Sequence, residues 1–372
     1  MSGADKNSEQ AGGKGSPRPG GRYREALLPV AILIGMAAVL TAGWDRFVPA
    51  DERILGIFFK PENLGNILRQ NAHYGILAVG MTFVIISAGI DLSVGSLLAF
   101  SSVVMASMID RHPGGGAGLA LLALGAGIMA GTGLGLANGF FITYSKALPG
   151  FLWRRAAARV KKARAPRLAM VQIQPFIVTL AMMSIARGFA FLWTGGRGID
   201  IYGDQPAAFA ALGQDLDLWV VKVPWPGVIF LLVVFASHVV LSRTRFGRFT
   251  YAIGSNEPAA ALSGIPVARV KVMVYAISGA LCGLAAAIYT SVQNAGRPDD
   301  GIGFELDAIA AAVIGGTSLA GGRGSVGGTL IGALIIGVLN NVLGLRGIDP
   351  NLQRVLKGAI IIAAVLLQKD RD

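Results

Sequence analysis

The segment GRFTYAIGSNEPAAALSGIPVARVK, from Gly247 to Lys271, lies between two long apolar runs and has basic residues at or near both of its ends. Its middle is polar and rich in alanine. Ser255 or Asn256 can cap a short helix there, because a side-chain oxygen at the N-cap accepts a backbone N–H that has no partner within the helix. The sequence therefore predicts a small helix in a loop between two membrane spans.

The residues that follow support this short helix and end it. Glu257 places negative charge in the first turn, where the helix dipole favours it, and Pro258 suits a position whose N–H has no partner. Residues 259–262 continue the helix, and Gly264 with Pro266 ends it. A small helix held between two spans suits docking into a groove of another protein. On these features alone, an ordinary cytoplasmic loop is the alternative.

The composition places the chain in the membrane. Hydrophobic residues make up 53% of the 372 residues and charged residues only 15%, which is low for a soluble domain of this size. The apolar residues fall in runs of about 20, the length that spans the hydrocarbon core of a bilayer. Glycines at 127, 131 and 135 recur at every fourth position and form a flat face for a neighbouring helix. We therefore predict one all-α polytopic membrane domain.

Several classes of function are disfavoured. The net charge of +12 lies in loops between apolar runs, without the aromatic-studded basic groove of a nucleic-acid-binding protein. The single cysteine, Cys282, cannot form an internal disulfide, and the three histidines have no metal-ligand spacing, so we expect no metal site. No Walker A motif occurs, so we expect this chain not to hydrolyse ATP.

Ten spans are predicted along the chain. Residues 1–25 form a basic tail that we expect to be disordered, and residues 26–368 form the transmembrane domain. We interpret the apolar run 26–42 as a retained first span, with a signal peptide as the alternative. The eighth span, 305–320, is short and flanked by glycines, and a re-entrant segment is the alternative there. The remaining spans are predicted at 63–87, 92–109, 119–144, 175–193, 225–241, 271–291, 327–343 and 352–368.

Basic residues set the predicted orientation. With both termini inside, most Lys and Arg residues fall in inner segments, as the positive-inside rule requires. The inner segments include a basic insertion at 145–174 and the segment 243–271. The insertion combines arginines and lysines with Phe151, Leu152 and Trp153, which predicts a helix lying on the inner leaflet. The alternative is a solvated loop whose charges only fix the topology.

Four stretches resemble one family of membrane proteins. They are the segment 247–279, AVGMTFVIISAGIDLSVGSLLAF from Ala78 to Phe100, PFIVTLAMMSIARGFAFLWTGG from Pro175 to Gly196, and GFELDAIAAAVIGGTSLAGGRGSVGGTLIGALIIGVLNN from Gly303 to Asn341. Together they resemble the ribose-type monosaccharide permeases of ATP-binding-cassette importers, within the group that includes branched-chain amino acid permeases. The match covers most of residues 63–367, and the insertion at 145–174 is where the chain departs from the family pattern.

The resemblance implies an architecture, a location and partners. It implies about ten helices in a vitamin-B12-permease-like, type II importer-like arrangement in a bacterial inner membrane. The implied partners are a second permease copy, ATPase subunits that hold ATP and Mg, a periplasmic or lipid-anchored sugar-binding protein, and membrane lipid, with no nucleic acid. This chain itself is expected to bind no cofactor. The implied function is uptake of a ribose-like pentose, another simple sugar or a polyol.

Two sets of residues follow as candidates. The resemblance assigns ATPase coupling to Gly254, Ser255, Asn256, Glu257, Ala259, Ala260, Ser263 and Gly264. Polar groups within spans are costly in lipid, so they are the candidates for the translocation pathway. These are Asn71, Asp91, Ser93, Thr179, Asn294 and Asn340, with Arg187, Glu305, Asp307 and Asn341 as weaker ones.

Five of these pathway candidates also have a purely structural interpretation. Asp91 lies in a break between two apolar helices, where it either lines a cavity or caps the helix that begins near Ser93. For Asn340 and Asn341 the structural interpretation is a hydrogen bond between helices. Glu305 and Asp307 lie near a predicted helix start, which favours capping.

Three functional alternatives remain open on the sequence. One is an importer of a branched-chain amino acid, a nucleoside or a signalling molecule. Another is an ATP-independent transporter or channel. A membrane-embedded enzyme is the third, and no nucleophile–base pair or metal cluster in the sequence supports it.

Overall fold

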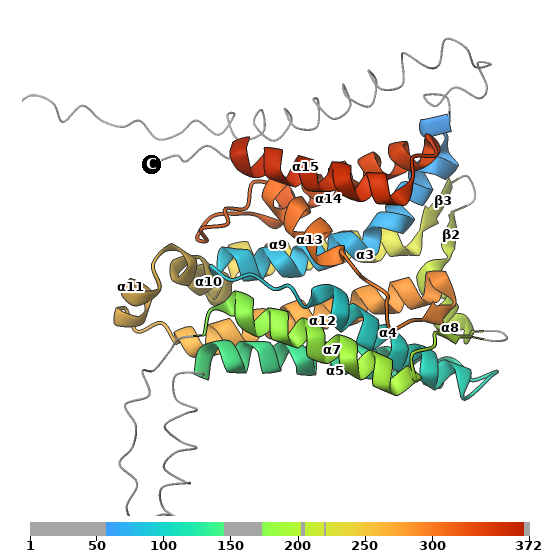
Figure 1. The fold of residues 1–372 in the computed structure, drawn as a ribbon, viewed down its shortest axis with the longest axis horizontal. Helices are drawn as coiled ribbons and strands as arrows, with labels where there is room; N and C mark the ends of the chain where they lie inside the picture. The colour runs from blue at the N-terminus through green and yellow to red at the C-terminus, as the bar shows by residue number, and fades with distance from the viewer. Residues whose placement is uncertain (1–56, 145–172, 202–204, 219–220, 368–372) are drawn as a thin grey trace, which may run out of the picture.

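A computed structural model describes residues 57–144, 173–201, 205–218 and 221–367 of the chain. The described part is a bundle of long helices that run roughly side by side along one axis (Figure 1). Five of these helices, α5, α7, α9, α12 and α14, are long and apolar enough to cross a membrane. The described residues therefore form a mostly helical, polytopic membrane protein. The predicted first span, 26–42, and most of the insertion at 145–174 lie outside the described residues.

The long helices lie close to the predicted spans. Up to the middle of the chain they are α3 (Pro61–Ile86), α4 (Val94–Asp110), α5 (Ala117–Tyr144), α7 (Pro175–Thr194) and α9 (Trp225–Arg243). The second half contributes α12 (Val267–Gln293), α14 (Val326–Leu345) and α15 (Pro350–Leu367). Lys60, Gln174 and Pro224 precede α3, α7 and α9 in extended conformation, and each of these helices has a proline in its first turn, where the missing N–H costs nothing.

The segment predicted as an uncertain eighth span is only half helical. Helix α13 covers Phe304–Ile314, and the helical part of the predicted span 305–320 therefore stops six residues early. Gly315 and Gly316 end it, and a turn-rich loop, 315–325, leads to α14. A helix of 11 residues rises only about 16 Å, roughly half of the hydrocarbon thickness.

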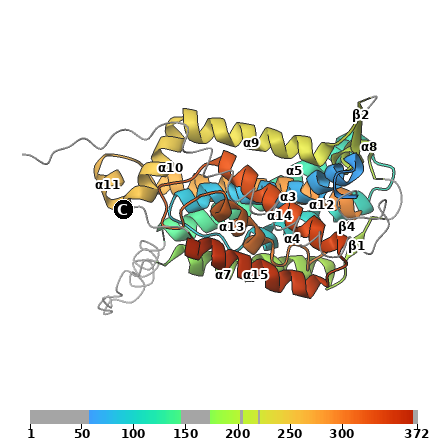
Figure 2. The ribbon, with the colours of Figure 1, turned by 90° about the horizontal axis from the view of Figure 1, so that it is seen from above.

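The two ends of the bundle carry different small elements. At one end lie α10 (Arg245–Ser255) and α11 (Glu257–Leu262); the helix α10 was not predicted as a separate element. At the other end lie α8 (Ala207–Ala210), a short 3-10 turn at Ala211–Gly213, and the hairpin of β2 (Asp215–Leu218) with β3 (Val221–Pro224). Strands β1 (Ile199–Asp200) and β4 (Ala295–Gly296) pair there too. Figures 1 and 2 show α11 and the β2–β3 hairpin at opposite ends.

Helix α12 lies at the centre of the core and packs against α5, α3 and α4. Its contact with α5 is made by the predicted glycine face. A side chain at Gly131 would overlap the carbonyl oxygen of Gly279, and one at Gly135 would overlap that of Tyr275. The backbones of the two helices therefore touch without intervening side chains, as small residues allow in membrane bundles.

We predict that this contact tolerates no larger residue. Gly131→Leu forces the two backbones apart, an overpacking cost of about 1–3 kcal/mol or more. The matched control is Gly133→Leu on the same helix, because a Cβ at Gly133 meets nothing within 4 Å. The measurement is the apparent melting temperature of the detergent-solubilised protein. Equal melting of the two variants would contradict the packing described here.

Candidate functional site

The segment between α9 and α12 folds into two short helices joined at Asn256. The Thr244 hydroxyl accepts from the Gly247 N–H at 3.2 Å and caps α10. The Asn256 Oδ1 accepts from the Ala259 N–H at 2.9 Å and caps α11. Of the two predicted N-caps, Asn256 is confirmed and Ser255 is wrong, because Ser255 is the last residue of α10 and its hydroxyl donates to the Tyr251 carbonyl.

Helix α11 ends where the sequence predicted. Gly264 has φ +80°, the left-handed conformation that a glycine adopts readily, and Pro266 precedes α12. The Glu257 carboxylate pairs with the Lys271 ammonium at 2.6 Å, which ties the start of α11 to the first turns of α12. Ala260 of α11 is buried, whereas Leu262 of the same helix is 91% exposed. Helix α11 therefore presents an apolar tip that contacts almost nothing among the described residues.

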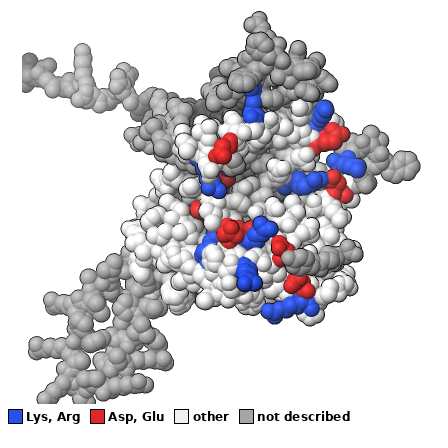
Figure 3. All heavy atoms as spheres, turned by 45° about the vertical axis from the view of Figure 1, so that its right-hand side comes forward, with Lys and Arg blue, Asp and Glu red and all other residues white. Residues whose placement is uncertain are grey.

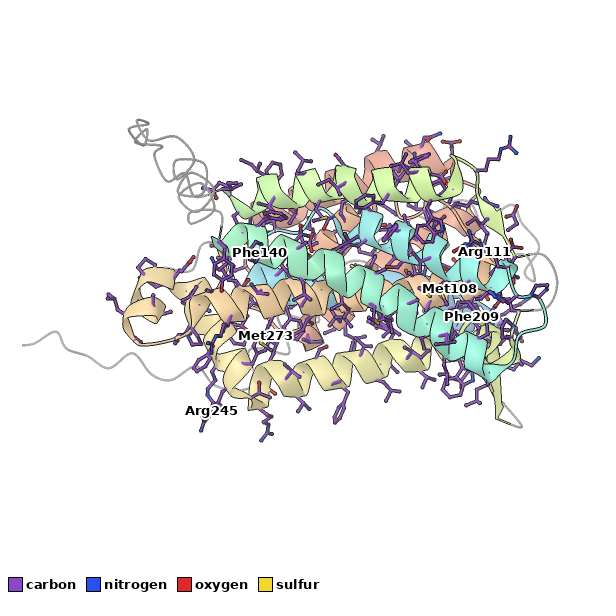
Figure 4. The ribbon with its side chains drawn as sticks, turned by 90° about the horizontal axis from the view of Figure 1, so that it is seen from below. Met108, Arg111, Phe140, Phe209, Arg245 and Met273 are labelled. Atoms are coloured by element: carbon purple, nitrogen blue, oxygen red, sulfur yellow. The ribbon has the colours of Figure 1, made fainter. Side chains whose placement is uncertain are left out.

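Four exposed arginines lie in or beside the segment that carries α11: Arg243, Arg245, Arg248 and Arg269. Figure 4 shows Arg245 pointing away from the bundle at the same end as Met273 and Phe140, whereas Met108, Arg111 and Phe209 lie at the opposite end. The α11 end is therefore basic and carries an isolated apolar residue.

Three backbone segments meet beneath α10. The Gly322 N–H donates to the carbonyl oxygen of Ile86, the last residue of α3, at 2.9 Å. A side chain at Gly254 would overlap that same carbonyl oxygen, and the Tyr251 hydroxyl donates to the Gly324 carbonyl at 2.8 Å. We call the end of α3, the end of α10 and the loop 315–325 together the junction. Helix α10 therefore contacts both the end of α3 and this loop.

Asp91 lies just beyond the junction, in the break between α3 and α4. The chain leaves α3 through Ala88, whose φ is +58°. The Asp91 Oδ1 accepts from the Ser93 N–H at 3.0 Å and from the Ser93 hydroxyl at 2.5 Å, and Oδ2 accepts from Ser278 of α12 at 3.1 Å. Asn138 of α5 donates to the Ser93 hydroxyl at 2.8 Å.

This Asp91 network is sealed from solvent. Asp91, Ser93 and Asn138 are 0% exposed and Ser278 is almost fully buried. The predicted capping role of Asp91 is confirmed only in part: Ser93 occupies the N-cap position of α4, and Asp91, two residues earlier, accepts from the Ser93 N–H and hydroxyl. It also joins the break to α5 and α12, so the network fixes three elements to one another.

The six predicted pathway residues do not form one site. The Thr179 hydroxyl donates to the Ile90 carbonyl at 3.2 Å, so Thr179 of α7 joins Asp91 and Ser93 at the break. Asn71 donates within its own helix to Ile67 at 2.6 Å and packs against Gly337 of α14. Asn294, with φ +52°, ends α12 and accepts from Gln205.

The adjacent residues Asn340 and Asn341 have different surroundings. Asn341 of α14 and Asn63 of α3 exchange two amide hydrogen bonds, at 3.0 and 2.8 Å, which confirms the interhelical hydrogen bond predicted for Asn341. For Asn340, the Oδ1 is buried without a partner in the described part of the chain. Asp307 pairs with Lys357 of α15 at 3.0 Å, and Gly303 occupies the N-cap position of α13.

The end that carries β2 and β3 is rich in opposite charges. Figure 3 shows acidic and basic side chains gathered in neighbouring pairs when this end is brought forward. Arg69 of α3 pairs with Asp215 of β2, and Arg297 pairs with Asp200 of β1 at 3.4 Å. Around half of each side chain in the second pair is exposed, so these contacts fix loops and contribute little to stability.

Several residues at these sites were not found from the sequence. Leu262 was identified only as part of a helix, and Tyr251 has no local signal. Asn138 and Ser278 are polar residues in apolar runs, a signal that could have identified them. Among the described residues, no group of three or more His, Cys, Asp or Glu side chains could hold a metal ion. The described arrangement is a set of helix breaks joined to a projecting helix.

A multi-helix membrane domain with such breaks is typical of transport proteins. The family model described as "Branched-chain amino acid transport system / permease component" matches residues 63–152 and 165–365. The chain belongs to this family, and it is a permease subunit of a transporter, not an enzyme. The unmatched residues, 153–164, fall inside the basic insertion.

Individual relatives match across most of the chain. The ribose import permease protein of Bacillus subtilis (strain 168) is 43% identical over 315 residues, covering 85% of this chain and 87% of the relative. The ribose import permease protein of Escherichia coli (strain K12) is 40% identical, covering 85% and 88%. The xylose transport system permease protein of the same strain is 36% identical, covering 83% and 85%. No solved structure matches the chain.

We predict that Asp91 stabilises the fold through its three accepted hydrogen bonds. Asp91→Ala leaves buried donors unpaired, at a cost of roughly 1–3 kcal/mol for each. Asp91→Asn, which keeps one acceptor oxygen, should be less damaging, and Ser278→Ala, which removes a single donor, least. The measurement is the melting temperature of each purified variant. Melting of Asp91→Ala at the wild-type temperature would contradict this role.

Proposed function

We propose that this chain is the membrane-spanning subunit of an ATP-binding-cassette importer for a monosaccharide, either a ribose-like pentose or another simple sugar or polyol. The observation that carries the proposal is the identity of 36–43% with ribose and xylose permeases over more than four fifths of the chain. The projecting helix α11 supports it, because a permease without its own ATP site needs a surface through which another subunit can act.

The proposed topology has about ten spans, with both termini on the cytoplasmic face of a bacterial inner membrane. The exposed arginines around α11 support an inward orientation of that end under the positive-inside rule. The ends of α5 and α7 that border the insertion lie at this same end (Figure 1). In this topology the insertion lies on the inner surface, where its basic residues face anionic lipid.

The two ends of the helix bundle are the proposed docking places for the partners. ATPase subunits dock at α11, a second permease copy completes the pathway, and a periplasmic or lipid-anchored sugar-binding protein docks at the opposite end. Among the residues predicted for coupling, Ala259, Ser263 and Gly264 are exposed, whereas Ala260 is buried at the base of α11 and Gly254 in the junction. ATP and Mg belong to the ATPase, and this chain is proposed to hold no cofactor.

The proposed mechanism is a change between two arrangements of the bundle. Closure of the ATPases moves α11, which is tied to α12 through Glu257 and Lys271. Helix α10 moves with it, and the junction carries the displacement to the end of α3 and to the loop 315–325. The break at Asp91 then moves relative to α5 and α12. ATP on one face and the loaded binding protein on the other each favour one arrangement.

A second candidate is an importer of another solute. The family description names branched-chain amino acids, which keeps an amino acid substrate open. The burial of Asp91 within its own hydrogen bonds argues against it, because among the described break residues it offers no exposed charge to an amino acid.

The deciding experiment is uptake into vesicles that carry this chain with the ATPase and binding protein from the same cell. We expect labelled sugar from a panel of pentoses, hexoses and polyols to accumulate only when ATP and the ATPase are present. Branched-chain amino acids serve as the comparison panel. Uptake that persists without the ATPase would replace the importer with a facilitator.

We predict that Leu262 is a principal contact of the ATPase. Leu262→Asp should weaken ATPase association by at least tenfold and abolish uptake, since a buried apolar anchor at an interface typically contributes about 2 kcal/mol. Because this side chain is 91% exposed, the melting temperature of the isolated permease should not change. Leu262→Met, which keeps an apolar tip, is the matched control. Association is measured by co-purification and by titration in nanodiscs. Full association of Leu262→Asp would exclude this contact.

A further inference from the structure

Four aromatic rings meet where α13 begins in the middle of the bundle. They are His73 and Tyr74 of α3, Tyr289 of α12 and Phe304 of α13, and we call them the aromatic cluster. The ring centroids of Tyr74 and Phe304 lie 4.4 Å apart, and those of His73 and Tyr289 lie 5.2 Å apart. Tyr289 and Phe304 are 5.8 Å apart and meet edge to face. Three helices therefore contribute rings to one place.

The cluster differs from the surrounding core in exposure and in hydrogen bonding. Tyr74, Tyr289 and Phe304 are each partly exposed, although Ile76 and Leu77 nearby on α3 are fully buried. His73 is more than nine tenths buried, and its Nε2 has no hydrogen-bond partner among the described residues. An unpaired buried polar atom costs free energy that a ligand hydroxyl would recover.

Two acidic groups near the cluster are already paired. Asp307 is held by Lys357 at 3.0 Å. Asp300 accepts from the Arg297 N–H at 2.8 Å. The groups that the cluster offers to a ligand are its aromatic faces, the tyrosine hydroxyls and the Nε2 of His73. Such a lining suits a neutral molecule that has both apolar C–H faces and hydroxyl groups.

The backbone that leads into the cluster is irregular. The segment 295–303 runs along α4, where a side chain at Gly296 would overlap the carbonyl oxygen of Ser102 and one at Gly301 that of Gly95. Arg187 of α7 donates to the carbonyl oxygens of Pro298 and Asp300 at 2.7 and 2.5 Å. Helix α13 starts only after this segment. Helices that begin within the membrane are characteristic of substrate sites in transporters.

We propose that the aromatic cluster is a contact site for the transported sugar within the membrane. This proposal rests on the proposed import function and adds the residues that touch the substrate. The C–H face of a neutral monosaccharide or polyol packs against Phe304 and the tyrosine rings. One sugar hydroxyl bonds to Nε2 of His73.

The first test measures how much sugar is moved for each ATP hydrolysed, in proteoliposomes that contain the complete importer. Phe304→Leu keeps apolar volume and removes the ring face, and His73→Leu removes the nitrogen. We expect each to lower the ratio about tenfold, the effect of losing roughly 1.4 kcal/mol of contact. The control is Phe230→Leu, because Phe230 of α9 is a fully buried ring that packs on α3 at Gly75.

The control separates a binding role from a packing role. Phe230→Leu should reduce the amount of folded protein and leave the ratio of sugar to ATP unchanged. A wild-type ratio in Phe304→Leu, or equal changes in Phe304→Leu and Phe230→Leu, would overturn the proposal. If the wild-type importer moves no sugar, it is the proposed function that fails.

A second test detects contact without requiring transport. The native cysteine, Cys282, is buried, so background labelling by a membrane-permeant thiol reagent should be low. Tyr289→Cys should be labelled, and millimolar ribose, xylose or mannitol should slow that labelling severalfold. Phe230→Cys is the buried control. Failure of every sugar to slow the labelling of Tyr289→Cys would exclude contact at the cluster.

Discussion

The constraint on which this structure depends is that a backbone N–H or C=O in hydrocarbon must find a partner within the protein. Helix α3 ends at Ile86 and α13 at Ile314, and in each case the following residues are not helical. Other segments satisfy polar groups at these ends: Gly322 of the loop after α13 donates to Ile86, and the Ile90 carbonyl accepts from Thr179 of α7. The end of α3 is therefore held both by the loop 315–325 and by α7.

Glycine is the residue that makes such contacts possible. The contact of Gly254 with Ile86 and that of Gly131 with Gly279 place backbone directly against backbone, where any side chain would collide. The first contact lies between a short helix and a span, and the second between two long helices. Close backbone contact therefore joins both the central pair of helices and the short helix α10 to α3.

Much of the fold could be predicted from the sequence because helix starts and apolar runs are local signals. Asn256, Glu257, Pro258 and Gly264 define α11 through capping, dipole and backbone preferences of single residues. The candidate site was harder to predict from the sequence, because it depends on contacts between distant segments. Local sequence signals do not reveal that Asp91 accepts a hydrogen bond from Ser278. Nor do they reveal that Asn71 donates within its own helix and packs against Gly337. Helix α10 was missed because its glycines resemble loop residues, and only the structure shows Gly247 packed against Leu241 of α9 and Gly254 against Ile86 of α3.

The burial of Asp91 affects how selectivity can be built in such a protein. A carboxylate that accepts three hydrogen bonds and is 0% exposed has no acceptor position facing a substrate. These hydrogen bonds therefore hold the break in place, and Asp91 does not select the substrate. The proposed selection within the membrane relies on partly exposed, uncharged groups, as Tyr74, Tyr289 and Phe304 are. Weak, neutral contacts of this kind suit a subunit that has to release its substrate on the other side of the membrane.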